Sequence, residues 1–223
     1  MKRTLIPLTA LMLAATLAGC DKADHAKPVK VAETPVAEAS APADPCADSA
    51  LAKALPPESD INGYAFVSRS CGYNSANAVY GKADGSQHLE ISLTDTGLPA
   101  PAGSEQSGMA DNYLETQTKV RDMTRQNVAL LQSAREAALK NGTAAEFGGE
   151  GYLPRVEKAT SGEPLVITVA GADEAAGANL TGLLKERYVL NLLSSDQPFG
   201  KDALAASKLL MPFVEKMQLG ELR

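Results

Sequence analysis

A turn that precedes a stretch of alternating side chains constrains the fold most strongly. Residues 87–94 place Leu89, Ile91 and Leu93 on one face and polar residues on the other, a period of two that is typical of a half-buried strand. The preceding Asp84-Gly85 pair favours the positive φ angles of a hairpin turn, and residues 73–82 lie on its other side. Residues 64–69 also alternate, so this region predicts three antiparallel strands.

A second β pattern occupies the later part of the chain. Residues 151–158 and 164–170 are separated by Thr160-Ser161-Gly162, which predicts another hairpin. Residues 187–194 are rich in apolar side chains and predict a third strand. The intervening residues 171–182 are acidic and rich in glycine and alanine, so we expect a surface loop there.

Three segments have helical patterns. Residues 47–55 predict a short helix that ends at Pro56-Pro57, and residues 201–217 predict an amphipathic helix that Pro212 should kink or restart. The apolar positions of that helix expected to face inward are Leu204, Leu209, Leu210, Phe213, Val214 and Met217.

Residues 109–140 predict the main helical segment. Its apolar or small positions are Met109, Tyr113, Val120, Met123, Leu130, Leu131, Ala134 and Ala138, with charged residues that include Arg121 and Arg135 on the other face. A single helix would be about 48 Å long, more than the diameter of a domain of this size, so we expect a break at the polar residues 124–127.

The order is therefore three strands, a long helical segment, three strands and a helix. Hairpins without short strand–helix–strand units predict an α+β fold, with an antiparallel sheet of about six strands in two three-strand groups and helices packed on it. This arrangement is similar in layout to the Mog1/PsbP type. The likeness concerns architecture and implies no activity.

The first twenty residues have the features of an export signal. Lys2-Arg3 precede an apolar run, and Leu17-Ala18-Gly19-Cys20 follow it. This tetrapeptide resembles the lipobox of bacterial lipoproteins. The resemblance implies that residues 1–19 are removed and that Cys20 carries a diacylglyceryl thioether and an acylated amine, which together would anchor the chain stably to a membrane. The alternative is an ordinary cleaved signal with Cys20 as a spare thiol.

The residue after the lipidated cysteine bears on which of the two membranes the lipoprotein is sorted to. Asp21 resembles the signal that retains lipoproteins on the inner membrane, so we expect the anchor in that membrane rather than the outer one, with the domain in the periplasm. Residues 20–45, which are rich in alanine and proline and lack aromatic side chains, are expected to be a disordered tether. Residues 46–223 are expected to form a single α+β domain.

Cys46 and Cys71 are the cysteines that remain if Cys20 is lipidated. An even number of cysteines in an exported protein predicts a structural disulfide between them. A redox role is disfavoured because the chain has no Cys-x-x-Cys motif.

The net charge and the residue composition limit the partners and cofactors that the chain can bind. The formal net charge is −6, and removal of Lys2 and Arg3 with the signal makes it −8 in the mature chain, so nucleic acid is not an expected partner. No catalytic motif is present, and the only histidines, His25 and His88, are too few for a histidine-based metal site. Asp173, Glu174 and Asn179 lack the spacing of a calcium loop. We therefore expect no metal and no cofactor.

Two functions remain. We favour a membrane-anchored envelope lipoprotein, a non-enzymatic accessory module that binds an envelope protein or a small ligand. The alternative is a periplasmic hydrolase that uses two carboxylates distant in the sequence. Clustered carboxylates in a pocket would favour the hydrolase, and a broad apolar patch would favour the binding module.

Overall fold

The computed structural model describes residues 44–104, 109–170, 177–195, 199 and 202–223. The predicted tether, with Cys20 and Asp21, lies outside these residues, as do Asp173 and Glu174. Within the described ranges, no helix has the length and apolar character needed to cross a membrane.

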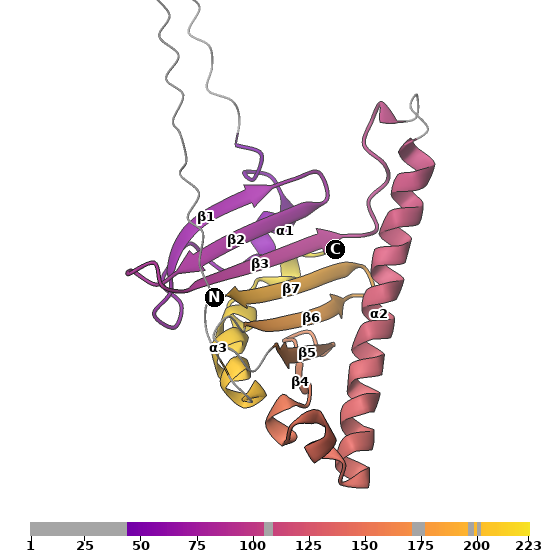
Figure 1. The fold of residues 1–223 in the computed structure, drawn as a ribbon. Coiled ribbons are helices and arrows are strands. Elements are labelled where there is room, and N and C mark those ends of the chain that lie inside the picture. Colours follow the sequence, from indigo (N-terminus) through magenta and orange to yellow (C-terminus); the bar gives the residue numbers. More distant parts are fainter. Residues whose placement is uncertain (1–43, 105–108, 171–176, 196–198, 200–201) are drawn as a thin grey trace, which may run out of the picture. The chain divides into compact units, whose positions relative to one another are not determined.

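Seven strands form one antiparallel sheet in the order β1-β2-β3-β7-β6-β5-β4 (Figure 1). The strands are β1 (Ala65–Cys71), β2 (Ser75–Gly81), β3 (His88–Asp95), β4 (Arg155–Lys158), β5 (Pro164–Val169), β6 (Ala178–Leu184) and β7 (Tyr188–Ser195). The predicted α+β class is confirmed. The sheet has a group of three strands and a group of four, which are joined where β3 pairs with β7.

The first group forms as the sequence predicts. Leu89, Ile91 and Leu93 of β3 are fully buried, whereas His88 and Glu90 are exposed. The turn between β2 and β3 closes when the Lys82 amide donates to the Gln87 carbonyl and the Gly85 amide donates to the Lys82 carbonyl. Gly85 has a φ of 71°, the positive value that a side chain would disfavour.

In β1 the predicted alternation stops after Phe66. The pairing with β2 changes register between Phe66 and Ser68, so Val67 is an extra residue in the strand. As a result Ser68 is exposed, while Arg69 is partly buried. After the bulge, each residue of β1 points to the opposite face of the sheet from the one that strict alternation predicts.

The second group contains a strand that the sequence analysis missed. β6 begins in the second half of the segment expected to be a loop and continues past its end, and it pairs with both β5 and β7. The turn between β6 and β7 runs from Lys185 to Arg187, and Lys185 and Glu186 have φ angles of 49° and 54°. Such turns normally contain glycine or asparagine, so this hairpin carries no local sequence signal. The hairpin at Gly162, in contrast, is confirmed, because the Ala159 amide donates to the Glu163 carbonyl.

The long helix α2 (Met109–Asn141) is unbroken, so the predicted break at residues 124–127 is wrong. Arg125 bonds Asp122 one turn earlier and also Glu186, and the Thr124 hydroxyl donates to the Val120 carbonyl. These bonds satisfy the polar middle of the helix without a kink. We expected a break because an unbroken helix would be longer than the diameter of the domain. α2 can be that long because it packs on β5, β6 and β7 over only part of its length and continues past them (Figure 1).

The predicted inward face of α2 is also partly wrong. Met123 and Leu130 are 68% and 67% exposed. Arg135, expected on the outer face, is partly buried and donates to the Pro154 carbonyl at 3.0 Å. The arginine can lie against the protein because its aliphatic stem packs while its guanidinium finds an oxygen.

Two shorter helices cover the other face of the sheet. They are α1 (Ala50–Ala54) and α3 (Ala203–Glu215), and three 3₁₀ turns, η2 (Ala144–Phe147), η3 (Glu150–Tyr152) and η4 (Leu219–Glu221), complete the described elements. α1 packs on β2 and β3, and α3 packs on β4, β5 and β6. Asp202 caps α3 by accepting from the Ala205 amide at 2.9 Å, and α3 continues through Pro212 without a restart.

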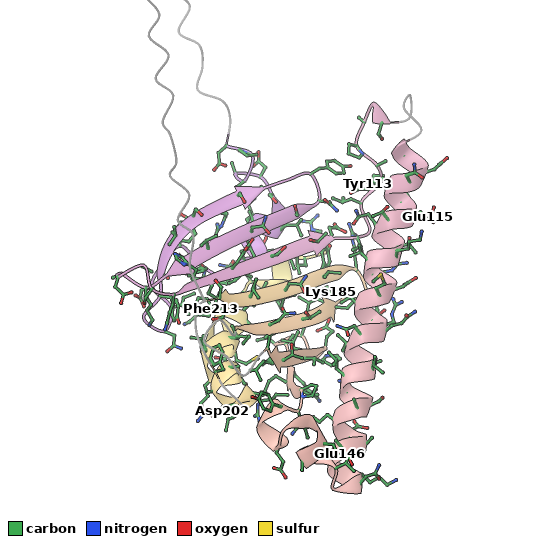
Figure 2. The ribbon with its side chains drawn as sticks, viewed as in Figure 1. Tyr113, Glu115, Glu146, Lys185, Asp202 and Phe213 are labelled. Carbon is green, nitrogen blue, oxygen red and sulfur yellow. A yellow bond between two sulfur atoms is a disulfide. The ribbon has the colours of Figure 1, made fainter. Side chains whose placement is uncertain are left out.

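The core lies between the sheet and these two helices. Phe213 of α3 is fully buried and meets the rings of Tyr64 and Tyr80 edge-on, at centroid distances of 6.1 and 5.0 Å (Figure 2). Of the residues of α3 predicted to face inward, Leu209, Leu210, Phe213 and Val214 are buried. Leu204 is the exception: it is 45% exposed and lines a groove beside the edge strand β4.

Candidate functional site

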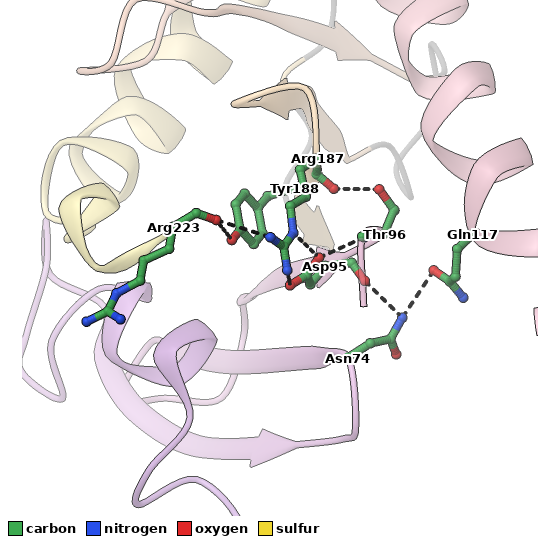
Figure 3. Close-up of polar contacts among 8 residues, drawn as sticks. Asn74, Asp95, Thr96, Gln117, Arg187, Tyr188 and Arg223 are labelled. Atoms are coloured by element: carbon green, nitrogen blue, oxygen red, sulfur yellow. Dashed lines mark hydrogen bonds and ion pairs between the residues drawn. The ribbon is translucent and has the colours of Figure 1, made fainter. Parts of the chain in front are cut away.

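The clearest polar network of the domain joins the two strand groups. Asp95 at the end of β3 accepts two hydrogen bonds from Arg187, from Nε to Oδ1 at 2.6 Å and from Nη2 to Oδ2 at 2.7 Å (Figure 3). The Asp95 side chain is only 6% exposed. The carboxylate raises the pKa of the Arg187 guanidinium, because it stabilises the charged form.

The same network ties down the last residues of the chain. Arg187 Nη1 and the Tyr188 hydroxyl both donate to the main-chain oxygen of Arg223, and Lys185 Nζ donates to the carbonyl of Leu222. The Thr96 hydroxyl donates to the Arg187 carbonyl at 2.5 Å. Asp95, Arg187 and Lys185 each have a protein partner, which is the arrangement of a structural clamp rather than of a site that awaits a ligand.

A groove lies at one edge of the sheet, between the edge strand β4 and α3. It encloses about 700 Å³, against about 390 Å³ for the hollow beside Arg187 and Asp95. All four residues of β4 line it, together with residues of α3. The α3 residues are Leu204, Ser207, Lys208, Met211, Pro212 and Glu215.

One carboxylate of the groove is held in place by the protein itself. Glu157 Oε1 accepts from Arg155 Nε at 2.5 Å and from the Ser207 hydroxyl at 2.7 Å. The second bond links β4 to α3. Because Arg155 neutralises Glu157 in this pair, neither group is left to compensate a ligand charge.

The other charged side chains of the groove have no ion-pair partner among the described residues. Lys158 and Lys208 are exposed, and no carboxylate among the described residues pairs with either of them. Glu215 is likewise exposed, near the end of α3. The unpaired groups therefore sum to one excess positive charge, within a chain whose net charge is −6.

Apolar side chains complete the groove. Leu204 keeps 45% of its surface exposed, and Val156, Met211 and Pro212 are partly buried around it. An accessible leucine next to unpaired lysines offers contacts for both an apolar and an anionic group. The arrangement is suited to binding.

The structure places the candidate residues chosen from the sequence at separate positions in the fold. Cys46 and Cys71 form the predicted disulfide, with an S–S distance of 2.02 Å and a Cα–Cα distance of 5.3 Å. His88 is exposed on β3, away from the groove. Asn179 lies exposed on β6, and no group of three histidine, cysteine or acidic residues in the described ranges could hold a metal ion.

Sequence reasoning did not find the groove. β4 is the second half of the strand predicted at residues 151–158, whose first residues belong to the turn η3 instead, and α3 lies within the helix predicted at residues 201–217. Nothing in either pattern indicates that the two lie side by side. Glu157 and Ser207, whose hydrogen bond joins them, are 50 residues apart. The exposure of Leu204 on an otherwise buried helix face becomes visible only after the helix is placed on the sheet. Comparison of the chain with protein families, with curated proteins and with solved structures finds no match.

Proposed function

We propose that this protein is a lipid-anchored binding module of the bacterial envelope, attached through Cys20 and facing the periplasm, which takes an envelope protein in the groove between β4 and α3. The observation that carries the proposal is the disulfide between Cys46 and Cys71. Such bonds persist in oxidising compartments, so the bond supports export. It also leaves Cys20, directly behind the apolar leader, as the remaining one of three cysteines.

The position of the disulfide fits a tethered domain. Cys46 is the first residue after the predicted tether, and Cys71 ends β1. The bond therefore fastens the point where the tether enters the domain to the sheet. The predicted tether would average roughly 25–30 Å if it behaves as a flexible chain, enough to hold the groove away from the lipid surface.

The chemistry of the groove supports binding more than hydrolysis. A hydrolase of the two-carboxylate type needs one acid and one base placed about the scissile bond. In the groove, Glu157 is engaged by Arg155 and Ser207, which leaves Glu215 as the other carboxylate. Exposed apolar and cationic side chains are, in contrast, what a docked protein segment requires.

The proposal is tested in growing cells with a photo-crosslinking amino acid placed at Leu204. Lys216, which is exposed at the end of α3 but does not line the groove, is the matched control position. Both versions are made with Cys20 and with Cys20→Ala. We expect the Cys20 protein in the membrane fraction, the Cys20→Ala protein outside it, and a discrete adduct from position 204 that position 216 does not give.

Two results would contradict the proposal. If the Cys20→Ala protein fractionates with membranes as the parent does, the lipid anchor is wrong. If positions 204 and 216 give the same adducts, the groove is not the binding site. Turnover of an ester, amide or glycoside substrate that Glu215→Gln abolishes would favour the hydrolase instead.

A further inference from the structure

The edge strand β4 presents to the groove backbone groups that bond no other described residue. Among the described strands β4 pairs only with β5, and the Ala159 amide donates to the Glu163 carbonyl at the hairpin. In an antiparallel pair, bonded and non-bonded residue pairs alternate. The pairs Glu157–Leu165 and Arg155–Ile167 are therefore bonded, whereas Val156 and Lys158 direct their N–H and C=O groups away from β5.

Pro164 provides an independent check of this assignment. It lies opposite Lys158 in the register and has no N–H to donate. A non-bonded pair is the only type that accommodates proline there without the loss of a ladder bond between β4 and β5. Within the described part of the chain, the outward groups of Lys158, and by alternation those of Val156, thus have no partner and can bond another strand.

The groove follows this free edge. Side chains of β4 alternate between the two faces of the sheet, and residues from both faces line the groove together with α3. Leu204 and Met211 lie on the α3 side, on the same face as Glu157, which bonds Ser207. Lys158, next to Glu157 in the strand, points to the other face.

The other sheet edge lacks these features. β1 is interrupted by the bulge at Val67, which disrupts the row of outward groups. Bulges of this kind protect an edge from pairing with another chain. The contrast singles out β4 as the edge at which a further strand can be added.

We propose that an extended segment of an acidic envelope protein pairs with β4 as an additional strand of the sheet. Its backbone bonds the free groups of Val156 and Lys158, its apolar side chains contact Leu204 and Met211, and its alternate acidic side chains meet Lys158. The excess positive charge of the groove selects acidic over basic segments. The segment would bind by adding a strand to the edge of the sheet. That it belongs to an envelope protein rests on the proposed function, which places the domain in the periplasm.

Binding is measured with the mature lipidated chain in detergent micelles and the peptide acetyl-Val-Glu-Val-Glu-Val-Glu-Val-amide. The counterpart with lysine in place of glutamate is the matched probe. We expect the acidic peptide to bind more tightly and to slow amide hydrogen exchange at Val156 and Lys158 by about tenfold or more, since bonded amides exchange only on opening. Added salt should weaken the binding.

Two variants separate the charge from the backbone contribution. Lys158→Glu should weaken binding about fivefold, and Lys216→Glu, the same charge change outside the groove, should leave it unchanged. Val156→Pro removes an outward N–H without loss of a β4–β5 bond and should weaken binding with little change in melting temperature. Lys208→Glu is a second charge variant if Lys158→Glu folds poorly.

The inference is overturned if both peptides bind equally, if exchange slows at β1 instead of β4, or if Lys158→Glu and Lys216→Glu behave alike. A dimer of this chain through β4, detected as a concentration-dependent mass without peptide, would also overturn it. The peptide assay does not depend on the lipid anchor. If Cys20→Ala does not change the membrane fractionation, the proposed function is refuted, but the proposed strand addition to β4 is not.

Discussion

Arg187 and Asp95 form a two-bonded ion pair at the seam between the two strand groups, with bonds of 2.6 and 2.7 Å. Asp95 ends β3 and Arg187 directly precedes β7, and their sequence separation is 92 residues. The pair therefore holds the seam at the end where the chain terminus is also bound.

Asp95→Asn should destabilise the domain by about 2 kcal/mol, because it leaves a partly buried guanidinium without its charge partner. The Arg187 side chain is 37% exposed, so water offsets part of the loss. Chemical denaturation measures the change. Glu115→Gln, which removes the exposed pair with Lys119, should change the stability much less, and equal effects of the two variants would contradict a stabilising role for the clamp.

Reduction of the bond between Cys46 and Cys71 should destabilise the domain by about 3 kcal/mol, because the unfolded chain regains the freedom of a closed loop of 25 residues. Thermal denaturation with and without reductant gives the shift. The double variant Cys46→Ser/Cys71→Ser should melt at the reduced temperature and not respond to reductant. Rapid alkylation of both thiols in the native exported protein would show that the bond does not form there.

Alkaline pH should weaken the fold through Tyr80. Burial is the main cause that raises the pKa of its phenol to about 12, and in the fold the hydroxyl donates to the carbonyls of Pro56 and Pro57. The phenol titrates near pH 10 in the unfolded chain, so its stabilising effect is complete below about pH 10 and is lost as the pH rises toward 12.

Tyr80→Phe tests this pH dependence. The variant should be about 1 kcal/mol less stable at neutral pH, from the lost hydrogen bonds, and its stability should fall less steeply between about pH 10 and 12 than that of the parent. Denaturation curves at several pH values give both quantities. Parallel pH profiles for parent and variant would exclude Tyr80 as the source.

Gly182→Ala should destabilise the sheet by about 1–3 kcal/mol through overpacking. Gly182 lies in β6 between Leu165 and Leu190, and an added Cβ would come within 2.3 Å of the Leu165 side chain. Gly220→Ala is the matched control, since a Cβ there would meet nothing within 4 Å. Equal melting temperatures for the two variants would mean that the core adapts to the extra methyl group.

Asp21→Ser tests the predicted retention of the anchor on the inner membrane. If Asp21 is the retention signal, the variant should move to the outer-membrane fraction on density-gradient separation, while the parent stays with the inner membrane. Asp24→Ser changes an acid of the same tether and serves as the control. Recovery of the parent in the outer-membrane fraction would rule out this role for Asp21.

The sequence by itself determined the features that neighbouring residues control. The alternation of Leu89, Ile91 and Leu93 selects the buried face of β3, and Gly85 permits the turn before it. The even pair Cys46 and Cys71 identified the disulfide, and the hairpins identified the antiparallel α+β class.

Tertiary structure alone decided the β6–β7 hairpin. Its turn holds Lys185 and Glu186 at positive φ without glycine or asparagine. The Lys185 amide donates to Glu163, which lies 22 residues away, and Glu186 accepts from Arg125, which lies 61 residues away. Because these stabilising partners are distant along the chain, no local pattern could report them. The groove depends on the same kind of contact, since only packing brings β4 beside α3.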